Sequence, residues 1–238
     1  MKDYWEISIE PGYYDKIYKE GLKNKRGFQS NWHLTTLKKI EKYLAEGIDH
    51  LDYASGPGTL VGNFSKSRSI GVDISKKQIK FAKENYSNYI FFELDNFNYK
   101  DYKEKFDLIT VLGLFEFIDL VEIKRILNEF SYMLKQNGIL IITTPNFKIG
   151  LKILLRVSQY FDITGYNEIY KSKFIRSSFK KFLHNQINFE VVTVENFLNI
   201  GAAFSVFSHN LSSFFEKIFN KIFQKKYGFL LFAILRKK

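Results

Sequence analysis

The sequence predicts an α/β protein built on a doubly wound, mostly parallel sheet. Strand-like apolar segments alternate with helix-like segments between residues 49 and 143, which is the rhythm of strand–helix–strand units. The segment 139–143 is apolar almost without a break, as a central parallel strand should be. The chain has 238 residues, of which 45% are hydrophobic, enough for one sizeable core, so we expect a single domain.

The elements follow one another in a regular order. A strand at 49–54 leads into a helix that begins at Gly58, and a strand at 69–73 leads into a helix with the capping-box spacing Ser75 to Gln78. Gly138 is expected as a left-handed cap after a long amphipathic helix. Residues 147–185 are expected to be helical and mixed. Further strands are expected at 89–93, 106–111, 139–143, 187–194 and 228–235, with helices at 76–85, 120–134 and up to about 224.

The turn after the first strand indicates a nucleotide-like cofactor. Asp52 is followed by small residues up to Gly58, and glycine lets the backbone approach a ligand closely. A nicotinamide site would need glycine where Thr59 stands. Asp73, at the end of the second strand, can accept hydrogen bonds from both hydroxyls of a ribose.

Five segments occur in one order and spacing: Asp52–Gly58, Gly71–Ser75, Glu93–Asn96, Phe106–Phe117 and Leu134–Leu140. Together they make the chain resemble the class I S-adenosylmethionine-dependent methyltransferases of the small-molecule type, loosely those of ubiquinone biosynthesis. The resemblance implies a seven-stranded Rossmann-like methyltransferase fold with an antiparallel last strand. It also implies three parts within the domain: an N-terminal helical lid (1–47), a cofactor-binding core (48–147), and a substrate-lid insertion after the fifth strand with the last two strands (148–238).

The resemblance further implies S-adenosyl-L-methionine as the cofactor and assigns residues to it. Asp73 would bind the ribose hydroxyls, and Asp95 with Asn96 would meet the adenine. The backbone at Ala54 and Leu112 would hold the methionine amino group. Ala54 replaces the family's first glycine, which alanine tolerates where φ is negative. The full expected set is Asp52, which supports the turn, with Ala54, Ser55, Gly56, Gly58, Asp73, Ile74, Asp95, Asn96 and Leu112.

Methyl transfer to an oxygen needs a group that helps a hydroxyl lose its proton. The candidates are His33, in a polar-aromatic cluster, and Glu116; a structural role for His33 stays open. Of the Glu-x-x-Glu-His pattern of quinone methyltransferases only Glu116 remains, which weighs against a quinone. Trp32 and Tyr166 are expected to line the substrate pocket, and no metal site is expected.

Charge is concentrated late in the chain. Residues 148–238 hold 15 Lys and Arg against 5 Asp and Glu, nearly all of the net charge of +11, and a cationic surface favours anionic partners. The helix at 211–224 is amphipathic and could lie on an anionic membrane. The favoured interpretation is that this helix packs on the sheet.

The expected acceptor is a small molecule, a glycan or a lipid-linked precursor, methylated in the cytoplasm by a soluble enzyme. The start of the chain lacks a secretory signal, and its longest apolar run, 229–235, is too short to span a bilayer. Two alternatives stay open. A nucleic-acid methyltransferase is disfavoured because no Asn-Pro-Pro-Tyr or Asp-Pro-Pro-Tyr follows the fourth strand. The other is a non-catalytic protein that binds S-adenosylmethionine.

Overall fold

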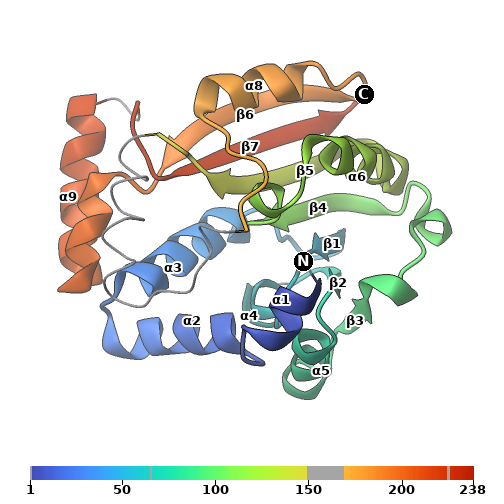
Figure 1. The fold of residues 1–238 in the computed structure, drawn as a ribbon, viewed down its shortest axis with the longest axis horizontal. Coiled ribbons are helices and arrows are strands. Elements are labelled where there is room, and N and C mark those ends of the chain that lie inside the picture. Colours follow the sequence, from blue (N-terminus) through green and yellow to red (C-terminus); the bar gives the residue numbers. More distant parts are fainter. Residues whose placement is uncertain (1, 65, 149–168, 224–225) are drawn as a thin grey trace.

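A seven-stranded sheet forms the centre of the computed structural model, which describes residues 2–64, 66–148, 169–223 and 226–238 (Figure 1). Its strand order is β3-β2-β1-β4-β5-β7-β6. Strands β1 to β5 are parallel, and β7 is antiparallel to both β5 and β6. The predicted sheet with its antiparallel last strand is therefore confirmed. The strands are β1 (Asp49–Tyr53), β2 (Arg68–Asp73), β3 (Ile90–Glu93), β4 (Phe106–Leu112), β5 (Leu134–Pro145), β6 (Phe189–Phe197) and β7 (Leu230–Lys237).

Helices cover both faces of this sheet. Helices α6 and α8 pack on one face, and α2, α3 and α4 pack on the other. Along β4, Leu108 faces α3, whereas Ile109 and Val111 face α6, because successive side chains of a strand point to opposite faces. The helices are α1 (Lys2–Ile7), α2 (Tyr13–Asn24), α3 (Phe28–Glu41), α4 (Thr59–Phe64), α5 (Lys76–Asn85), α6 (Leu120–Met133), α8 (Arg176–His184) and α9 (His209–Phe223), with 3-10 helices η1 (Leu94–Asn96), η2 (Tyr99–Tyr102), η3 (Phe115–Phe117) and η5 (Ile200–Val206).

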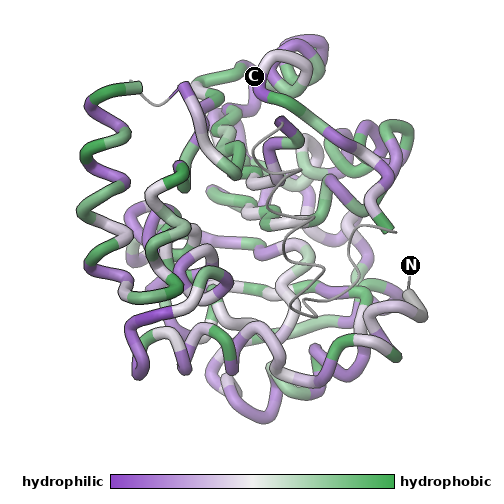
Figure 2. The backbone as a smooth tube through the Cα atoms, turned by 60° about the vertical axis from the view of Figure 1, so that its left-hand side comes forward, coloured by the Kyte–Doolittle hydropathy of each residue, from purple (hydrophilic) through white to green (hydrophobic). Residues whose placement is uncertain are grey.

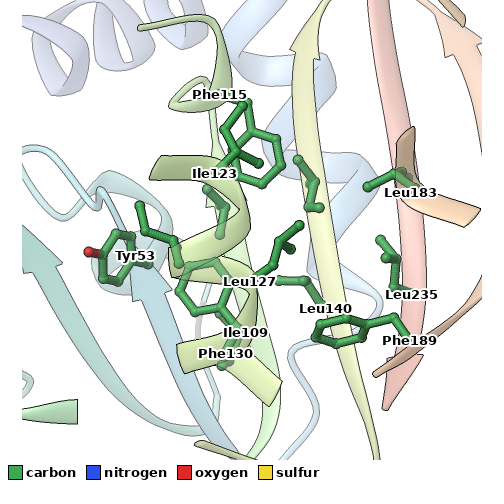
Figure 3. Close-up of a cluster of buried hydrophobic side chains, with 14 of the residues drawn as sticks. Tyr53, Ile109, Phe115, Ile123, Leu127, Phe130, Leu140, Leu183, Phe189 and Leu235 are labelled. Carbon is green, nitrogen blue, oxygen red and sulfur yellow. The ribbon is translucent and has the colours of Figure 1, made fainter. Parts of the chain in front are cut away.

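The larger core cluster lies between the sheet and helices α6 and α8 (Figure 3). Leu127 and Phe130 of α6 point at the sheet, and the Phe130 ring meets Tyr53 of β1 edge to face, with ring centroids 5.0 Å apart. Each large apolar side chain buried in this way contributes about 1.5–3 kcal/mol. The helical spacing of apolar residues in α6 thus predicted its buried face correctly.

The start of α5 differs from the predicted capping box. The Ser75 hydroxyl accepts a hydrogen bond from the Gln78 amide at 3.4 Å, as an N-cap does. The Gln78 side chain does not return the bond to Ser75. Its Oε1 accepts from the Gly12 amide at 3.0 Å, and its Nε2 donates to the Glu10 carbonyl at 2.8 Å. Gln78 therefore attaches the N-terminal segment to α5.

The predicted left-handed cap at Gly138 is wrong. Asn137 is the residue in the left-handed region, with φ of 62°, and β5 begins at Leu134, directly after α6. Gly138 is needed for a different reason. A Cβ there would lie 2.8 Å from the Lys135 carbonyl oxygen, so the glycine permits a close approach of the backbone within β5.

The expectation that the amphipathic helix near 211–224 packs on the sheet is also wrong. This helix, α9, packs against η5 and stands away from the sheet at the left of Figure 1. The chain from β6 back to β7 runs through η5 and α9, while α8 covers β6. Within the described parts of the chain, no helix is long and apolar enough to span a bilayer.

Candidate functional site

The sequence-predicted cofactor residues gather at one edge of the sheet. They lie at or just after the carboxyl ends of β1, β2, β3 and β4. The strand order changes direction between β1 and β4, and open α/β sheets bind ligands outside the carboxyl ends of their strands at such a switch point. The fold therefore directs attention to the turn that follows β1.

That turn has an unusual backbone. Ala54, Gly56 and Gly58 have φ of 64°, 53° and 77°, and the Ser55 amide donates to the Val72 carbonyl at 2.9 Å. The expectation that Ala54 replaces a glycine at negative φ is therefore wrong. An alanine in the left-handed region costs about 1–2 kcal/mol, because its Cβ approaches the following carbonyl oxygen.

The glycines near the turn serve two purposes. A Cβ on Gly58 or Gly71 would lie 2.8 Å or 2.5 Å from the ring of Phe91, so these two glycines make room for the core. Gly56 differs, because the nearest atom to a Cβ there is Cδ2 of Tyr14 at 4.0 Å. No neighbouring atom crowds the backbone of Gly56, which suits the close approach of a ligand.

Asp73 holds the turn to the start of α5. Its carboxylate accepts from the Gly56 amide at 2.8 Å and from the Ser75 amide at 2.8 Å. Burial raises its pKa, against the lowering effect of these backbone hydrogen bonds. A carboxylate has about four acceptor positions, so capacity remains for further donors. Asp73 therefore stabilises the start of α5 and keeps acceptor positions for further donors.

Asp52 lies beneath the turn in β1. Its Oδ1 accepts a hydrogen bond from the Thr110 hydroxyl of β4 at 2.6 Å. Burial raises the pKa of Asp52 to about 7, and the negative charge of Asp73 adds to the effect. The hydrogen bond thus joins β1 to β4, directly below the switch point.

The remaining predicted cofactor residues differ in exposure. Ile74 is half-buried just after β2, whereas Asp95 and Asn96 are exposed in η1, just after β3. Leu112 is the last residue of β4, and Gly113 beyond it donates its amide to the Thr143 carbonyl at 3.0 Å. All of these lie at the same edge of the sheet as the turn.

The N-terminal segment lies across this edge. The ring of Trp5 packs edge-on against Phe117, after β4, with centroids 5.1 Å apart. Glu6 accepts a hydrogen bond from the Lys76 amide, after β2. Because β1 lies between β2 and β4 in the sheet, α1 lies across the end of β1.

A cavity of about 100 Å³ brings both predicted catalytic residues together. His33 comes from α3 and Glu116 from η3, segments more than eighty positions apart in the chain. Trp32, expected to contact substrate, and Leu112, expected to contact cofactor, line the same cavity. The lining residues are Trp32, His33, Thr36, Leu37, Leu112, Gly113, Glu116, Thr143, Thr144, Pro145 and Leu230.

Glu116 is a buried carboxyl in the wall of this cavity. The Thr144 hydroxyl donates to its Oε2 at 3.1 Å, and its backbone carbonyl accepts from the amides of Lys171 and Ser172. Burial raises the pKa of Glu116 to about 8, only partly offset by hydrogen bonds. Glu116 therefore carries a proton over most of the neutral range and can release it near its upper end.

His33 is neutral at physiological pH. Burial lowers its pKa to about 4, and its ring lies 5.1 Å from that of Tyr14, centroid to centroid. A neutral imidazole always offers one nitrogen as an acceptor. His50, by contrast, is fully buried between the hydroxyls of Ser69 and Thr110 at 2.9 Å each, so it joins β1 to β2 and β4 within the sheet.

Several features of this region escaped the sequence analysis. Thr143 and Thr144 line the cavity, and their polar side chains at the end of an otherwise apolar strand were a usable signal. The role of Gln78 in attaching the N-terminal segment gave no signal in the sequence beyond the capping-box spacing from Ser75. Tyr166 lies outside the described residues. No group of three or more His, Asp or Glu side chains that could hold a metal occurs in the part of the chain that the structure describes.

Comparison with known proteins places these observations in context. Residues 44–172 match the family model described as "Methyltransferase domain". The chain is 35% identical over 112 residues to a ribosomal protein L11 methyltransferase of Dictyoglomus thermophilum and 30% identical over 130 residues to that of Aquifex aeolicus, covering 43% and 52% of this chain. The matched regions span 37% and 49% of those relatives.

Solved structures share the fold at low sequence identity. Magnesium protoporphyrin IX methyltransferase from Synechocystis PCC 6803, solved with bound SAH, aligns with a TM-score of 0.64 and 13% identity over 100% of this chain and 98% of that one. A SAM-dependent methyltransferase from Archaeoglobus fulgidus aligns with a TM-score of 0.57 and 18% identity, over 86% and 93% of the two chains.

Proposed function

The chain belongs to the methyltransferase domain family, and on that premise we propose that it transfers a methyl group from S-adenosyl-L-methionine to an oxygen of its acceptor. The acceptor we propose is a small molecule, a glycan or a lipid-linked precursor. The observation that carries the proposal is the cavity that joins Glu116 and His33 at the carboxyl ends of β4 and β5. It lies at the end of β4, beside the expected cofactor edge.

The residues at the β1 turn fit a nucleoside cofactor. No neighbouring atom crowds Gly56, and Asp73 retains acceptor positions for ribose hydroxyls. The buried hydroxyl of Ser55 has no hydrogen-bond partner among the described residues, so the turn also holds an unused polar atom. We assign the cofactor to the whole predicted set: Asp52, Ala54, Ser55, Gly56, Gly58, Asp73, Ile74, Asp95, Asn96 and Leu112.

The bound cofactor would supply an electrophilic methyl group, and the protein's own residues would orient the acceptor and take its proton. His33 is neutral above a pKa of about 4, so at physiological pH its free ring nitrogen can accept a hydrogen bond from an acceptor hydroxyl and take up its proton only transiently as the methyl group is transferred. Glu116, protonated below a pKa of about 8, can donate a hydrogen bond that orients the acceptor. Trp32 would form an apolar wall of the same cavity.

A protein acceptor is the second candidate. It is favoured by the identity of 35% to a ribosomal protein L11 methyltransferase. The match covers 37% of that relative, so the shared region corresponds to less than half of the protein with that activity. The two candidates differ in acceptor and agree on the cofactor.

Calorimetric titration with S-adenosylmethionine tests the cofactor assignment. The wild type and an exposed control, Glu20→Ala, should bind it equally, and Asp73→Ala should bind at least about tenfold more weakly, because two charge-assisted hydrogen bonds are worth about that much. Thermal unfolding of each variant shows whether the turn remains folded. Equal binding by wild type and Asp73→Ala, or binding by neither, would refute the assignment.

Labelled cofactor tests the acceptor. Transfer of the labelled methyl group into the small-molecule or lipid fraction of a cell extract supports the first candidate, and transfer into purified ribosomal protein L11 supports the second. A His33→Ala variant that binds cofactor normally should lose most of the transfer. Unchanged transfer by this variant would remove His33 from the mechanism.

A further inference from the structure

Helix α9 presents a row of large apolar side chains to solvent. Leu211, Phe214 and Ile222 are 38%, 58% and 62% exposed, and Ile218 lies between them. Their spacing of three, four and four residues places all four on one side of the helix. Ser212 is the only buried residue that the structure describes in α9. We name these four residues the α9 apolar row.

The side of α9 next to the apolar row packs on η5, while Leu211, Phe214 and Ile222 stay exposed. The Phe215 ring stacks on Phe204 of η5 with centroids 4.0 Å apart. The Asn31 side chain of α3 donates to the Ser212 hydroxyl at 3.2 Å. These contacts hold the helix against the rest of the protein along one side. Figure 2 shows α9 at the left edge, with hydrophobic and hydrophilic residues alternating along the helix.

Other apolar side chains extend the exposed surface beyond α9. Val206 and Phe207, at the end of η5 just before the helix, are 58% and 74% exposed. Tyr227, which lies beyond the far end of α9, is 57% exposed. Monomeric soluble proteins rarely expose apolar side chains in such a concentration, and a cluster of this kind marks an interaction surface.

The charges beside the row are positive. Lys217 and Lys221, one helical turn apart, flank it. Glu216 is the only acid between residues 196 and 238, against seven Lys and Arg in the same segment. Its Oε1 is buried without a hydrogen-bond partner in the described structure, and burial raises its pKa to about 7, so it points away from the row.

A second source of positive charge lies at the start of α9. The His209 amide donates to the Lys25 carbonyl at 2.7 Å, which brings the exposed end of α2 to this point. Lys25 and Arg26 are both exposed there. The apolar row therefore has basic residues along one side and at one end.

We propose that α9 and the end of η5 form a docking surface for an anionic lipid bilayer, with α9 lying parallel to the membrane. An exposed apolar stripe flanked by lysines is what an interfacial helix requires: the apolar side chains enter the headgroup boundary and the lysines meet anionic lipids. A second copy of the chain fits less well, since a two-fold contact would bring the same basic residues together. This inference does not depend on the methyl acceptor.

Vesicle flotation with the full chain tests the proposal. Vesicles of phosphatidylcholine with about one third phosphatidylglycerol should bind the protein, and pure phosphatidylcholine should bind it far less. Binding should weaken as the salt concentration is raised, because salt screens the electrostatic attraction between the lysines and the anionic lipids. Failure to bind anionic vesicles at low salt overturns the proposal.

Two pairs of variants identify the surface. Phe214→Asp should weaken vesicle binding at least about tenfold. The control Ile187→Asp should leave binding unchanged, because Ile187 is 86% exposed and lies outside α9 and η5. The double variant Lys217→Glu with Lys221→Glu should also weaken vesicle binding at least about tenfold, because each basic residue near an anionic membrane contributes about 1 kcal/mol of binding free energy. The matched control is Lys180→Glu with Lys181→Glu on α8. Equal losses in target and control variants overturn the assignment.

Competing partners give different results in the same experiments. Association of two copies would appear in analytical ultracentrifugation as a dimer that Phe214→Asp dissolves. Nucleic-acid binding would persist in Phe214→Asp and disappear in the lysine variant. Either result, without vesicle binding, refutes the proposal. Should Phe214→Asp fail to fold, as judged by circular dichroism, Phe214→Ser provides the same test.

Discussion

The change Glu116→Gln tests the electrostatics of the cavity directly. Burial raises the pKa of Glu116 from 4.5 to about 8, so the folded protein holds this proton more tightly than the unfolded chain. Ionisation of Glu116 therefore opposes folding. The contribution of the protonated group is fully present below about pH 4.5 and is lost progressively as the pH rises toward 8.

The size of the effect follows from the shift. One pKa unit corresponds to about 1.4 kcal/mol, so ionisation of Glu116 lowers the stability of the wild type by about 4 kcal/mol at pH 8 and by about 1 kcal/mol at pH 5. Glutamine keeps the size of the side chain and an oxygen that can accept from Thr144, but it cannot ionise. The Glu116→Gln variant should gain about 3 kcal/mol relative to the wild type between pH 5 and pH 8.

Urea unfolding followed by circular dichroism at the two pH values measures this difference. The wild-type free energy of unfolding contains contributions from other acids, which cancel when variant and wild type are compared at one pH. The exposed Glu20→Gln is the matched control and should show no such dependence. A difference between Glu116→Gln and wild type that is the same at pH 5 and pH 8 would refute the reasoning.

Three further changes test the fold around the site. Ala54→Gly relieves the strain at φ of 64°, and this gain exceeds the smaller loss that arises because glycine makes the unfolded chain more flexible. Thermal unfolding should therefore show an increase in stability of up to about 1 kcal/mol; a clear decrease would contradict this. Phe91→Ala leaves a hole beside the β1 turn and should cost about 3–5 kcal/mol in urea unfolding; a cost below about 1 kcal/mol would mean that the ring is poorly packed. Asp49 accepts hydrogen bonds from Arg68 and Lys135, which hold its pKa well below 3.8. Its ionised form therefore stabilises the protein above that pH, so Asp49→Asn should be less stable at pH 7, and the difference should shrink as the pH falls below about 4; a constant difference would argue against the ion pairs.

The sheet, and the edge at which the candidate cofactor residues gather, were predictable because their signals are local. A parallel strand buried on both faces appears as an apolar run, and Asp73 follows such a run directly. The turn after β1 was recognised from its small residues. Its backbone conformation was not, because a sequence does not record the sign of φ at Ala54.

The cavity was only partly predictable. His33 and Glu116 were each chosen as candidates from their own surroundings in the sequence. That they line one cavity follows from the way α3, η3 and the end of β5 come together in the folded protein, which no local pattern encodes. Thr144 illustrates the same limit, since its hydrogen bond to Glu116 spans 28 residues.

The position of α9 was not predictable from its amphipathic pattern. An apolar side indicates that a helix has a partner, and a helix between two strands of a sheet usually finds it there. In α9 the partner on one side is η5, and the pattern cannot distinguish a short 3-10 helix from a sheet. That the Oε1 atom of Glu216 is buried can be seen only in the folded chain.

The placement of β7 between β5 and β6 has a consequence for the order of assembly. In the described sheet β6 pairs with β7 and with no other strand. During synthesis β6 leaves the ribosome before β7, so β6 stays an unpaired strand until β7 has emerged. The nascent chain therefore exposes an edge of β5 and a free β6 at the same time. This interval, rather than the finished sheet, is where a chaperone or a wrong pairing would act.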